Sequence, residues 1–315
     1  MQLSEDNGHG RKVAARGLPV IFVPMRLLPL ATFLTLLVAV PAPAHPPQLL
    51  LQVAQFRSLD QTRPSGEVEI SATVPTQPLT YRQRAPKSFQ SSAVVDLTIL
   101  KADGTAAWQE TVTLKPPVLN DTTIALKNPL SFLKRVTLPD GTYTLRGHIR
   151  DQYNPTTGEA TVELPLTVAA PTAPAFSDIV FLARPAAKAS AAGTFNRGGY
   201  LLTRAPGGYY GRGADNVFFY TELNAVPAGR AVRLHYHLAA PDGTAADADA
   251  PPVTALAGRP TPLVGQLPLG PLPAGPFTLT IEARDATTHK ILATQRQSGQ
   301  RSLTDYAPAG APGPR

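Results

Sequence analysis

The chain contains one sequence stretch twice, and this repeat is the strongest constraint on its fold. The two copies occupy residues 138–151 and 272–285, and half of their positions are identical. Each copy begins with a Pro-x-Gly turn, after which an aromatic residue, Tyr143 or Phe277, opens a run of alternating apolar side chains. A tight turn followed by such alternation is typical of a β-strand. The repeat therefore predicts two copies of one β-domain.

The remaining sequence supports an all-β protein. Short alternating runs punctuated by turns recur throughout, and no window after the amino-terminal region keeps a helical period. This pattern predicts two tandem immunoglobulin-like β-sandwich domains, residues 45–169 and 176–297, joined by a Pro-containing linker at 170–175. Residues 298–315 are predicted to be a disordered tail. The expected strands besides the repeated ones are 49–57, 67–74, 93–101, 106–114, 121–126, 132–136, 160–168, 177–183, 217–223, 230–238, 263–267 and 290–296, with a long polar loop at 75–92.

The amino-terminal region has the layout of a secretory signal peptide. Residues 1–44 contain a basic part, an apolar run at 27–40 and a small-residue pattern that ends at Ala44. Met25 begins a conventional signal by itself, so residues 1–24 are a candidate misassigned start. The alternative is a membrane anchor, but prolines limit the apolar run to fewer than the ~20 residues that span a bilayer. We expect an exported protein, periplasmic or extracellular, with no membrane span in the mature chain.

The absence of cysteine narrows the chemistry that the protein can perform. With no cysteine in 315 residues, there is no disulfide, thiol nucleophile or lipidation cysteine. Export without disulfides favours a bacterial envelope protein with cores large enough to be stable unaided. The formal net charge of +7 is mildly basic. Its dispersed charges indicate an ordinary solvated surface, with attraction to anionic envelope polymers as the alternative.

Three segments of the second predicted domain resemble a family of exported bacterial proteins. They are residues 176–183 with Ser-Asp-Ile, residues 194–198, and residues 217–224 with a Tyr- and Glu-bearing strand. These resemble the tandem β-sandwich region that precedes the module in GWxTD-domain-containing proteins, and the resemblance covers roughly residues 48–296. The Gly-Trp-x-Thr-Asp motif itself is absent, and the sole tryptophan, Trp108, falls in the first predicted domain. The resemblance therefore implies location and architecture, and it assigns no activity.

The titratable residues offer few candidates for a metal or catalytic site. His235 and His237 lie two apart in a predicted strand, so their imidazoles share a face and are candidate metal ligands. No nearby segment offers an obvious third ligand, so the hypothesis of a solvated strand face is preferred and no metal or cofactor is predicted. No nucleophile motif or phosphate-binding loop occurs. A small hydrolase or metal-dependent enzyme is thus the alternative, and it would require His235, His237, Glu222 and Asp178 to converge in one cleft.

The most promising binding surface is a Gly-, Tyr- and Arg-rich loop in the second predicted domain. Tyrosine and arginine bring large contact area to recognition loops, and glycine allows their display. Export argues against nucleic acid as a partner, so we expect an envelope protein or glycan. Replacing Tyr209 and Tyr210 is expected to weaken binding without lowering the melting temperature, unless the tyrosines are packing groups. The predicted contacts are Arg197, Tyr200, Arg204, Tyr209, Tyr210 and Arg212.

Together these observations predict a non-catalytic protein of the bacterial cell envelope. Its expected role is to bind a protein or glycan partner, or to space other components. The absence of any catalytic motif carries this prediction, since a hydrolase needs a nucleophile with a base or a placed pair of carboxylates.

Overall fold

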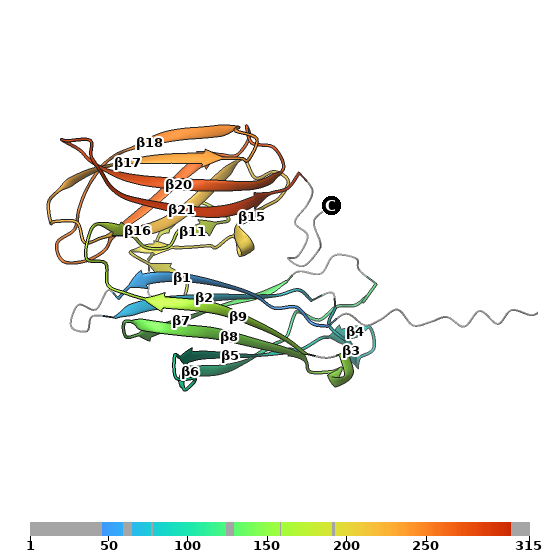
Figure 1. Ribbon diagram of the computed structural model, residues 1–315. Coiled ribbons are helices and arrows are strands. Elements are labelled where there is room, and N and C mark those ends of the chain that lie inside the picture. The colour runs from blue at the N-terminus through green and yellow to red at the C-terminus, as the bar shows by residue number, and fades with distance from the viewer. Residues whose placement is uncertain are drawn as a thin grey trace, which may run out of the picture. The chain divides into compact units, whose positions relative to one another are not determined.

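The computed structural model describes residues 46–58, 65–76, 78–123, 129–157, 159–190 and 193–303 (Figure 1). The predicted signal peptide at 1–44 lies outside the described residues, as does the predicted tail from residue 304 onward. In the described part of the chain, no helix is long and apolar enough to cross a membrane.

The first sandwich consists of two antiparallel sheets. One has three strands in the order β1-β2-β7, and the other has four in the order β6-β5-β8-β9. The bounds are β1 Leu50–Arg57, β2 Gly66–Val74, β5 Ala93–Lys101, β6 Ala106–Leu114, β7 Leu130–Leu138, β8 Gly141–Asp151 and β9 Glu159–Val168. A separate hairpin of β3 (Arg82–Ala85) and β4 (Ser88–Gln90) lies within the predicted loop at 75–92.

The second sandwich repeats this arrangement. Its smaller sheet places β16 between β19 and the short strands β10 and β11. Its larger sheet has the order β18-β17-β20-β21, with β15 added in parallel to β21. The bounds are β10 Ala175–Phe176, β11 Val180–Leu182, β15 Tyr209–Tyr210, β16 Asn216–Asn224, β17 Ala231–Ala239, β18 Ala245–Thr254, β19 Thr261–Pro268, β20 Gly275–Asp285 and β21 Ile291–Arg301.

The repeated sequence stretch occupies the same place in both sandwiches. It supplies β8 in the order β6-β5-β8-β9 and β20 in the order β18-β17-β20-β21. Each copy pairs with the strand that is followed by a hairpin turn, β5 or β17. The prediction of an all-β chain with two tandem immunoglobulin-like sandwiches is confirmed.

Each sandwich has its own apolar core, built from alternate residues of its strands. In the first, Val95, Leu97 and Ile99 of β5 pack against Val68 and Ile70 of β2. The second core includes Phe219, Phe277 and Tyr236 and draws on both of its sheets. Trp108 is half-buried against the first core. Period-two alternation thus directs one face of each strand inward.

Several features differ from the sequence prediction. The strand predicted at 177–183 is interrupted, since residues 177–179 are not in a strand and only Val180–Leu182 form β11. Strand β18 was not predicted, because its Ala-Asp-Ala-Asp-Ala-Pro-Pro segment is rich in residues that strands disfavour. It lies at a sheet edge, where proline is tolerated and its alanines pack on the core. Strand β21 continues to Arg301, past the predicted domain end at 297. Of the predicted strand at 121–126, residues 121–123 are not in a strand and residues 124–126 lie outside the described residues.

The two sandwiches share a third apolar cluster. Phe56 of β1 belongs to one buried cluster with Val180, Leu182, Leu202 and Tyr220 of the second sandwich, and its ring centre lies 6.1 Å from that of Tyr220. The described residues of both sandwiches accordingly belong to one compact unit. The linker predicted at 170–175 therefore joins two sandwiches that are also in direct side-chain contact.

Candidate functional site

The two smaller sheets each carry acidic side chains on the face turned away from their own core. On β2, Val68 and Ile70 are core residues, so the intervening Glu67 and Glu69 point the other way. On β16, Phe219 and Leu223 are core residues, so Glu222 lies on the opposite face. Glu69 and Glu222 are nevertheless both buried. Charged groups at such depth need partners.

The partners come from the segment between β11 and β16. This connection contains a small sheet of β12 (Ala187–Lys188), β14 (Tyr200–Leu201) and β13 (Asn196–Arg197), followed by a 3-10 turn at Pro206–Gly208. Gly198 turns β13 into β14 with φ 56°, in the left-handed region that favours glycine. A Cβ at Gly198 would come within 2.2 Å of the Tyr220 hydroxyl. The glycine therefore allows the turn to rest directly on β16.

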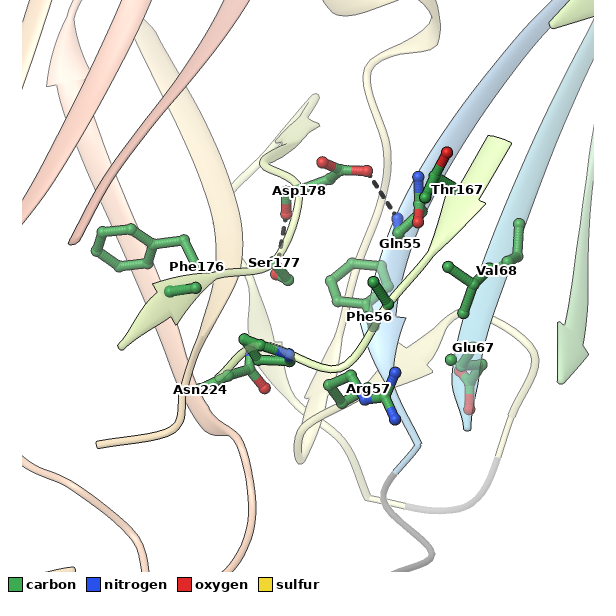
Figure 2. A pocket seen from close by; sticks show the side chains of 15 residues that line it. Gln55, Phe56, Arg57, Glu67, Val68, Thr167, Phe176, Ser177, Asp178 and Asn224 are labelled. Carbon is green, nitrogen blue, oxygen red and sulfur yellow. Dashed lines mark hydrogen bonds between the residues drawn. The ribbon is translucent and has the colours of Figure 1, made fainter. Parts of the chain in front are cut away.

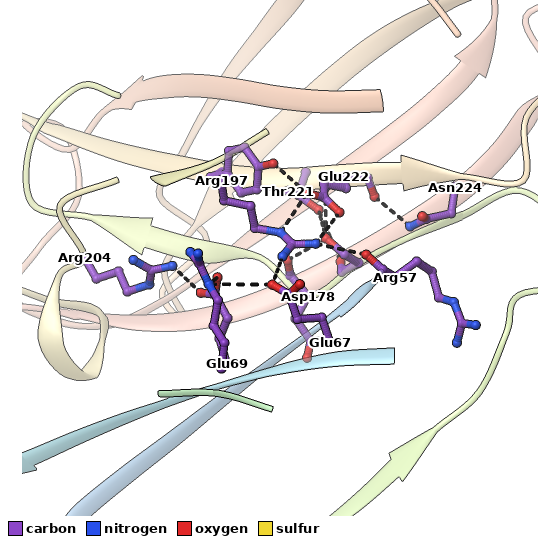
Figure 3. A network of polar contacts seen from close by, with 12 residues as sticks. Arg57, Glu67, Glu69, Asp178, Arg197, Arg204, Thr221, Glu222 and Asn224 are labelled. Atoms are coloured by element: carbon purple, nitrogen blue, oxygen red, sulfur yellow. Dashed lines mark hydrogen bonds and ion pairs between the residues drawn. The ribbon is translucent and has the colours of Figure 1, made fainter. Parts of the chain in front are cut away.

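Arg197 joins the two sandwiches through a buried guanidinium (Figure 3). Its Nε donates to Glu222 Oε1 at 2.7 Å and its Nη2 to Glu222 Oε2 at 3.0 Å. The same group donates to Glu67 and to the carbonyl oxygen of Arg57 on the first sandwich. Its carbon lies 3.9 Å from the centre of the Phe56 ring, a cation–π contact. Every face of this side chain is thus occupied by the protein itself.

A second group of charges lies beside the first. Arg204 donates to Glu69, whose other oxygen accepts from Arg135 Nε of β7 at 2.8 Å. Together with Arg197, Glu67 and Glu222, these groups form what we call the clamp: three arginines and three glutamates. The charges balance, and bidentate Arg–carboxylate geometry is the strongest form of such pairs.

The electrostatics of the clamp follow from its burial. Burial raises the pKa of Glu222, and the Arg197 guanidinium opposes this rise. Burial acts to lower the pKa of Arg197, but Glu222 and Glu67 hold it above its ordinary value. The Tyr220 hydroxyl donates to Glu222 Oε1 at 2.6 Å, and burial raises the pKa of this phenol. Each partner therefore depends on the others, since breaking a buried pair leaves an uncompensated charge.

A polar pocket of about 260 Å³ lies next to the clamp, at the linker (Figure 2). Asp178 lines it and accepts a hydrogen bond from the Gln55 amide at 2.8 Å. Burial raises the pKa of this carboxyl, and the Gln55 amide opposes the rise. A second, mainly apolar groove of about 350 Å³ is lined by Phe132, Leu201 and Phe195, whose side chain is half-exposed.

The predicted contact residues divide between internal and surface positions. Arg197 and Tyr210 are buried, and Arg204 is held by Glu69. Tyr210 packs on Phe181 and Phe277 and donates to the carbonyl oxygens of Leu182 and Phe218.

The other three predicted residues are less enclosed. Tyr200 is half-buried, with its ring 6.4 Å from that of Tyr220. Tyr209 is half-buried, and Arg212 is exposed, with its Nε donating to Leu303 O at 3.3 Å. Replacing Tyr210 is therefore expected to destabilise the fold, which corrects the expectation of an unchanged melting temperature.

The candidate metal ligands face a strand that the sequence did not reveal. His235 Nδ1 is hydrogen-bonded to Asp249 at 2.8 Å, and His237 Nδ1 to Asp247 at 2.8 Å, across the β17–β18 pair. Among residues 46–303 that the structure describes, no group of three or more His, Cys, Asp or Glu side chains is arranged to hold a metal ion. Both imidazoles lie on the outer face of the larger sheet, whereas Glu222 and Asp178 lie on the smaller sheet's side. The four groups do not share a cleft.

Sequence reasoning missed the acidic half of the clamp. Glu67 and Glu69 alternate with core residues in β2, which normally indicates a solvated face. Their partners in the second sandwich, Arg197 and Arg204, are 130 and 135 positions away along the chain. The available signal was three arginines within a glycine-rich loop of the second sandwich, and it was interpreted as a surface for an external partner.

The fold and its interior define an all-β protein of two tandem immunoglobulin-like sandwiches. No protein-family model matches the chain, and no curated protein matches its sequence. Among solved structures, the chain is similar to red sea bream transglutaminase (8% identity, TM-score 0.22, covering 80% of this chain and 31% of that one).

Two further solved structures are similar at the same level. One is a tetra-tandem repeat from the extending region of a large adhesion protein (12% identity, TM-score 0.25, covering 83% and 69%). The other is β-glucuronidase from Bacteroides uniformis (10%, 0.29, 80% and 32%). The chain spans about a third of the length of the two enzymes.

Proposed function

We propose that the protein is an exported, non-catalytic module of the bacterial cell envelope that holds two β-sandwiches as one rigid piece and engages an envelope partner. The observation that carries this proposal is the clamp. Burying Glu69, Glu222 and Arg197, with three partly buried partners, costs desolvation energy, and such groups favour one specific arrangement over others. A spacer or scaffold needs a fixed arrangement of its parts.

Three observations on the chain support the remaining parts of the proposal. The layout of residues 1–44 favours export, and the absence of cysteine in an exported chain favours a bacterial envelope protein. The resemblance to the sandwich region of GWxTD-domain-containing proteins favours the bacterial envelope. The separation of His235 and His237 from Glu222 and Asp178 supports a non-catalytic role, because the enzyme hypothesis required these four groups to converge. Detecting the chain in the periplasmic or extracellular fraction, with an amino terminus at or near His45, tests export.

The rigidity can be measured directly, because the chain has no native cysteine. Thr113 on β6 and Thr294 on β21 are exposed, one on each sandwich. Spin labels attached at T113C and T294C should give a narrow distance distribution by pulsed electron paramagnetic resonance. The additional changes R197M and R204M should broaden it while circular dichroism still reports strand. A distribution that is already broad with the clamp intact would overturn the proposal.

A further inference from the structure

The β3–β4 hairpin carries a concentration of positive charge that the clamp does not use. It extends from the first sandwich (Figure 1), and its sequence from Arg82 to Gln90 contains three basic residues and no acidic one. Arg82, Arg84 and Lys87 are all exposed. Among the residues that the structure describes, none of these three forms an ion pair with a carboxylate.

Two of these arginines gather on a single aromatic ring. The guanidinium carbons of Arg82 and Arg84 lie 4.9 and 5.1 Å from the centre of the Tyr153 ring. Arg84 also donates to the Tyr153 hydroxyl. The two cations are therefore held within roughly 10 Å of each other, about the distance over which salt screens charges. Like charges held this close repel, and a bound anion would relieve that repulsion.

The ring is itself fixed in place by the end of the repeated strand. One Asp151 oxygen accepts from the Tyr153 amide at 2.9 Å, and the other accepts from the Thr80 amide at 2.6 Å, just before β3. The far side of the hairpin is tied to the chain by two backbone hydrogen bonds between Phe89 and Leu119, each 2.8 Å. At the tip, Lys87 adopts a left-handed φ of 52°. The basic groups are thus displayed by a backbone anchored on both sides.

We propose that this basic hairpin binds an acidic polysaccharide, with Arg82, Arg84 and Lys87 contacting its anionic groups. This inference names a partner class for the envelope role proposed above. Arginine suits carboxylate or sulfate groups because its planar fork donates in pairs. Alternate residues on a strand lie about 6.6 Å apart, so Arg82 and Arg84 can meet successive anionic groups along an extended polymer.

Two features of the hairpin disfavour other polyanions. Both arginines already lie against Tyr153, so its ring is not a free stacking platform for nucleic-acid bases. The hairpin also presents no exposed large apolar side chain, since Phe89 is half-buried. A membrane surface is engaged most strongly by basic groups combined with apolar ones.

The test uses the full mature chain and polygalacturonate as the probe, measured by calorimetry or affinity electrophoresis at two salt concentrations. We expect binding that weakens with salt. We expect R82S/R84S/K87S to reduce the affinity by about tenfold or more and to flatten the salt dependence. The matched control is R233S/R259S/K290S, which removes three exposed cations from the second sandwich. We expect this control to change the affinity by less than about twofold, since like-charged groups beyond a screening length contribute little.

A further variant tests the arrangement of the charges. Y153L keeps every charge but removes the ring that gathers them, and it should weaken binding to polygalacturonate at unchanged net charge. Circular dichroism confirms that each variant is folded. Equal losses in the two triple variants would overturn the inference, as would no binding, unaltered binding by Y153L, or tighter binding to single-stranded DNA or anionic vesicles. These outcomes are independent of the spin-label distances, so failure here leaves the rigid-module proposal standing or falling by its own test.

Discussion

The two sandwiches share a sheet order and differ in how their smaller sheets are connected. In the first, the chain passes from β1 to β2 through residues 58–65. In the second, it passes from β11 to β16 through residues 183–215, which contain two arginines of the clamp. The glutamates Glu67 and Glu69 of the first sandwich pair with the arginines of that longer connection as well as with Arg135 of β7. A duplicated domain can thus acquire a fixed contact with its sister by elaborating one loop.

The repeated strand shows a similar divergence at its final residue. Asp151 accepts hydrogen bonds from the amides of Thr80 and Tyr153, and so anchors the basic hairpin. Its counterpart Asp285 caps its own turn at Thr287 and Thr288 and binds Arg230 at 2.7 Å. These hydrogen bonds lower the pKa of Asp285. Each carboxylate therefore caps its own turn, and it also holds a different distant segment, Thr80 in one copy and Arg230 in the other.

The largest loss of stability is expected when Arg197, in the connection at residues 183–215, is replaced. R197M leaves Glu222 and Glu67 without their shared cation, so the free energy of unfolding should fall by about 3–5 kcal/mol. Urea unfolding at pH 7 measures this. The matched control is R146M, which breaks an exposed pair with Glu163 and should cost no more than about 1 kcal/mol.

The double variant R197M/E222L tests whether the loss in R197M comes from the unpaired Glu222 carboxylate or from the lost attraction between the two side chains. Because it removes the buried carboxylate as well, it should be more stable than R197M. A loss below about 1 kcal/mol for R197M would contradict the clamp, since that is the value of an exposed pair.

The next effect concerns the two tyrosines at the end of the same connection. Tyr210 is buried among Phe181 and Phe277, so Y210A should lower the free energy of unfolding by about 3 kcal/mol or more. Tyr209 is half-buried, and Y209A should cost less. Thermal melts of the two variants compare adjacent residues of one strand. Equal losses of melting temperature in Y209A and Y210A would contradict the burial of the Tyr210 side chain.

The fold was largely predictable from the sequence because its signals are local. The repeated Pro-x-Gly turn, the alternating run in β5 and the turns after β5 and β17 each appear within about ten residues. The sequence concealed β18, where Asp247, Asp249 and two prolines obscure the alternation. Burial of its alanines against the core outweighs their low strand propensity.

The candidate sites were predictable only in part, because their halves lie far apart in the chain. The loop of the second sandwich stood out through Arg197, Arg204 and Tyr210, but the sequence does not show whether an arginine faces solvent or a buried glutamate. Tyr153 and Arg84 are 69 positions apart. The sequence around either residue gives no sign that they meet. Both the clamp and the basic hairpin therefore depend on contacts between residues that are distant in the chain.

A smaller effect is expected where the two copies pack their repeated aromatic differently. Phe277 lies across from Gly299, whereas Tyr143 lies across from Leu166. A Cβ at Gly299 would come within 2.4 Å of the Phe277 ring and 2.9 Å of the Gly208 carbonyl oxygen. G299A should therefore cost about 1–3 kcal/mol in urea unfolding. Gly270 has open space around it, so G270A serves as the control and should be nearly neutral.

The smallest effect is expected from two carboxyl groups, one in each sandwich, whose contributions to the free energy of unfolding change with pH in opposite directions. Burial raises the pKa of Asp178 in the second sandwich, while Arg57 lowers the pKa of Asp140 in the first. Between the ordinary carboxyl pKa of about 3.9 and the raised value, folded Asp178 holds more protons than the unfolded chain does. Its contribution to the free energy of unfolding is therefore full below about pH 3.9 and declines as the pH rises through that window.

For Asp140 the sign is opposite. Its contribution is present above about pH 3.9 and is lost as the pH falls toward the lowered value. Unfolding curves measured from pH 3 to pH 7 give the free energy of unfolding at each pH. In the parent protein this free energy should decline as the pH rises above about 4, and D178N should remove that decline. D140N should remove the rise in the free energy of unfolding that occurs as the pH increases toward about 3.9. Asparagine keeps an oxygen that can accept from the Gln55 amide, so D178N tests the charge and not the hydrogen bond. The contact between the sandwiches shields Asp178 from water but does not shield Asp140. Identical pH profiles for D178N and D140N would therefore show that this contact does not close over Asp178.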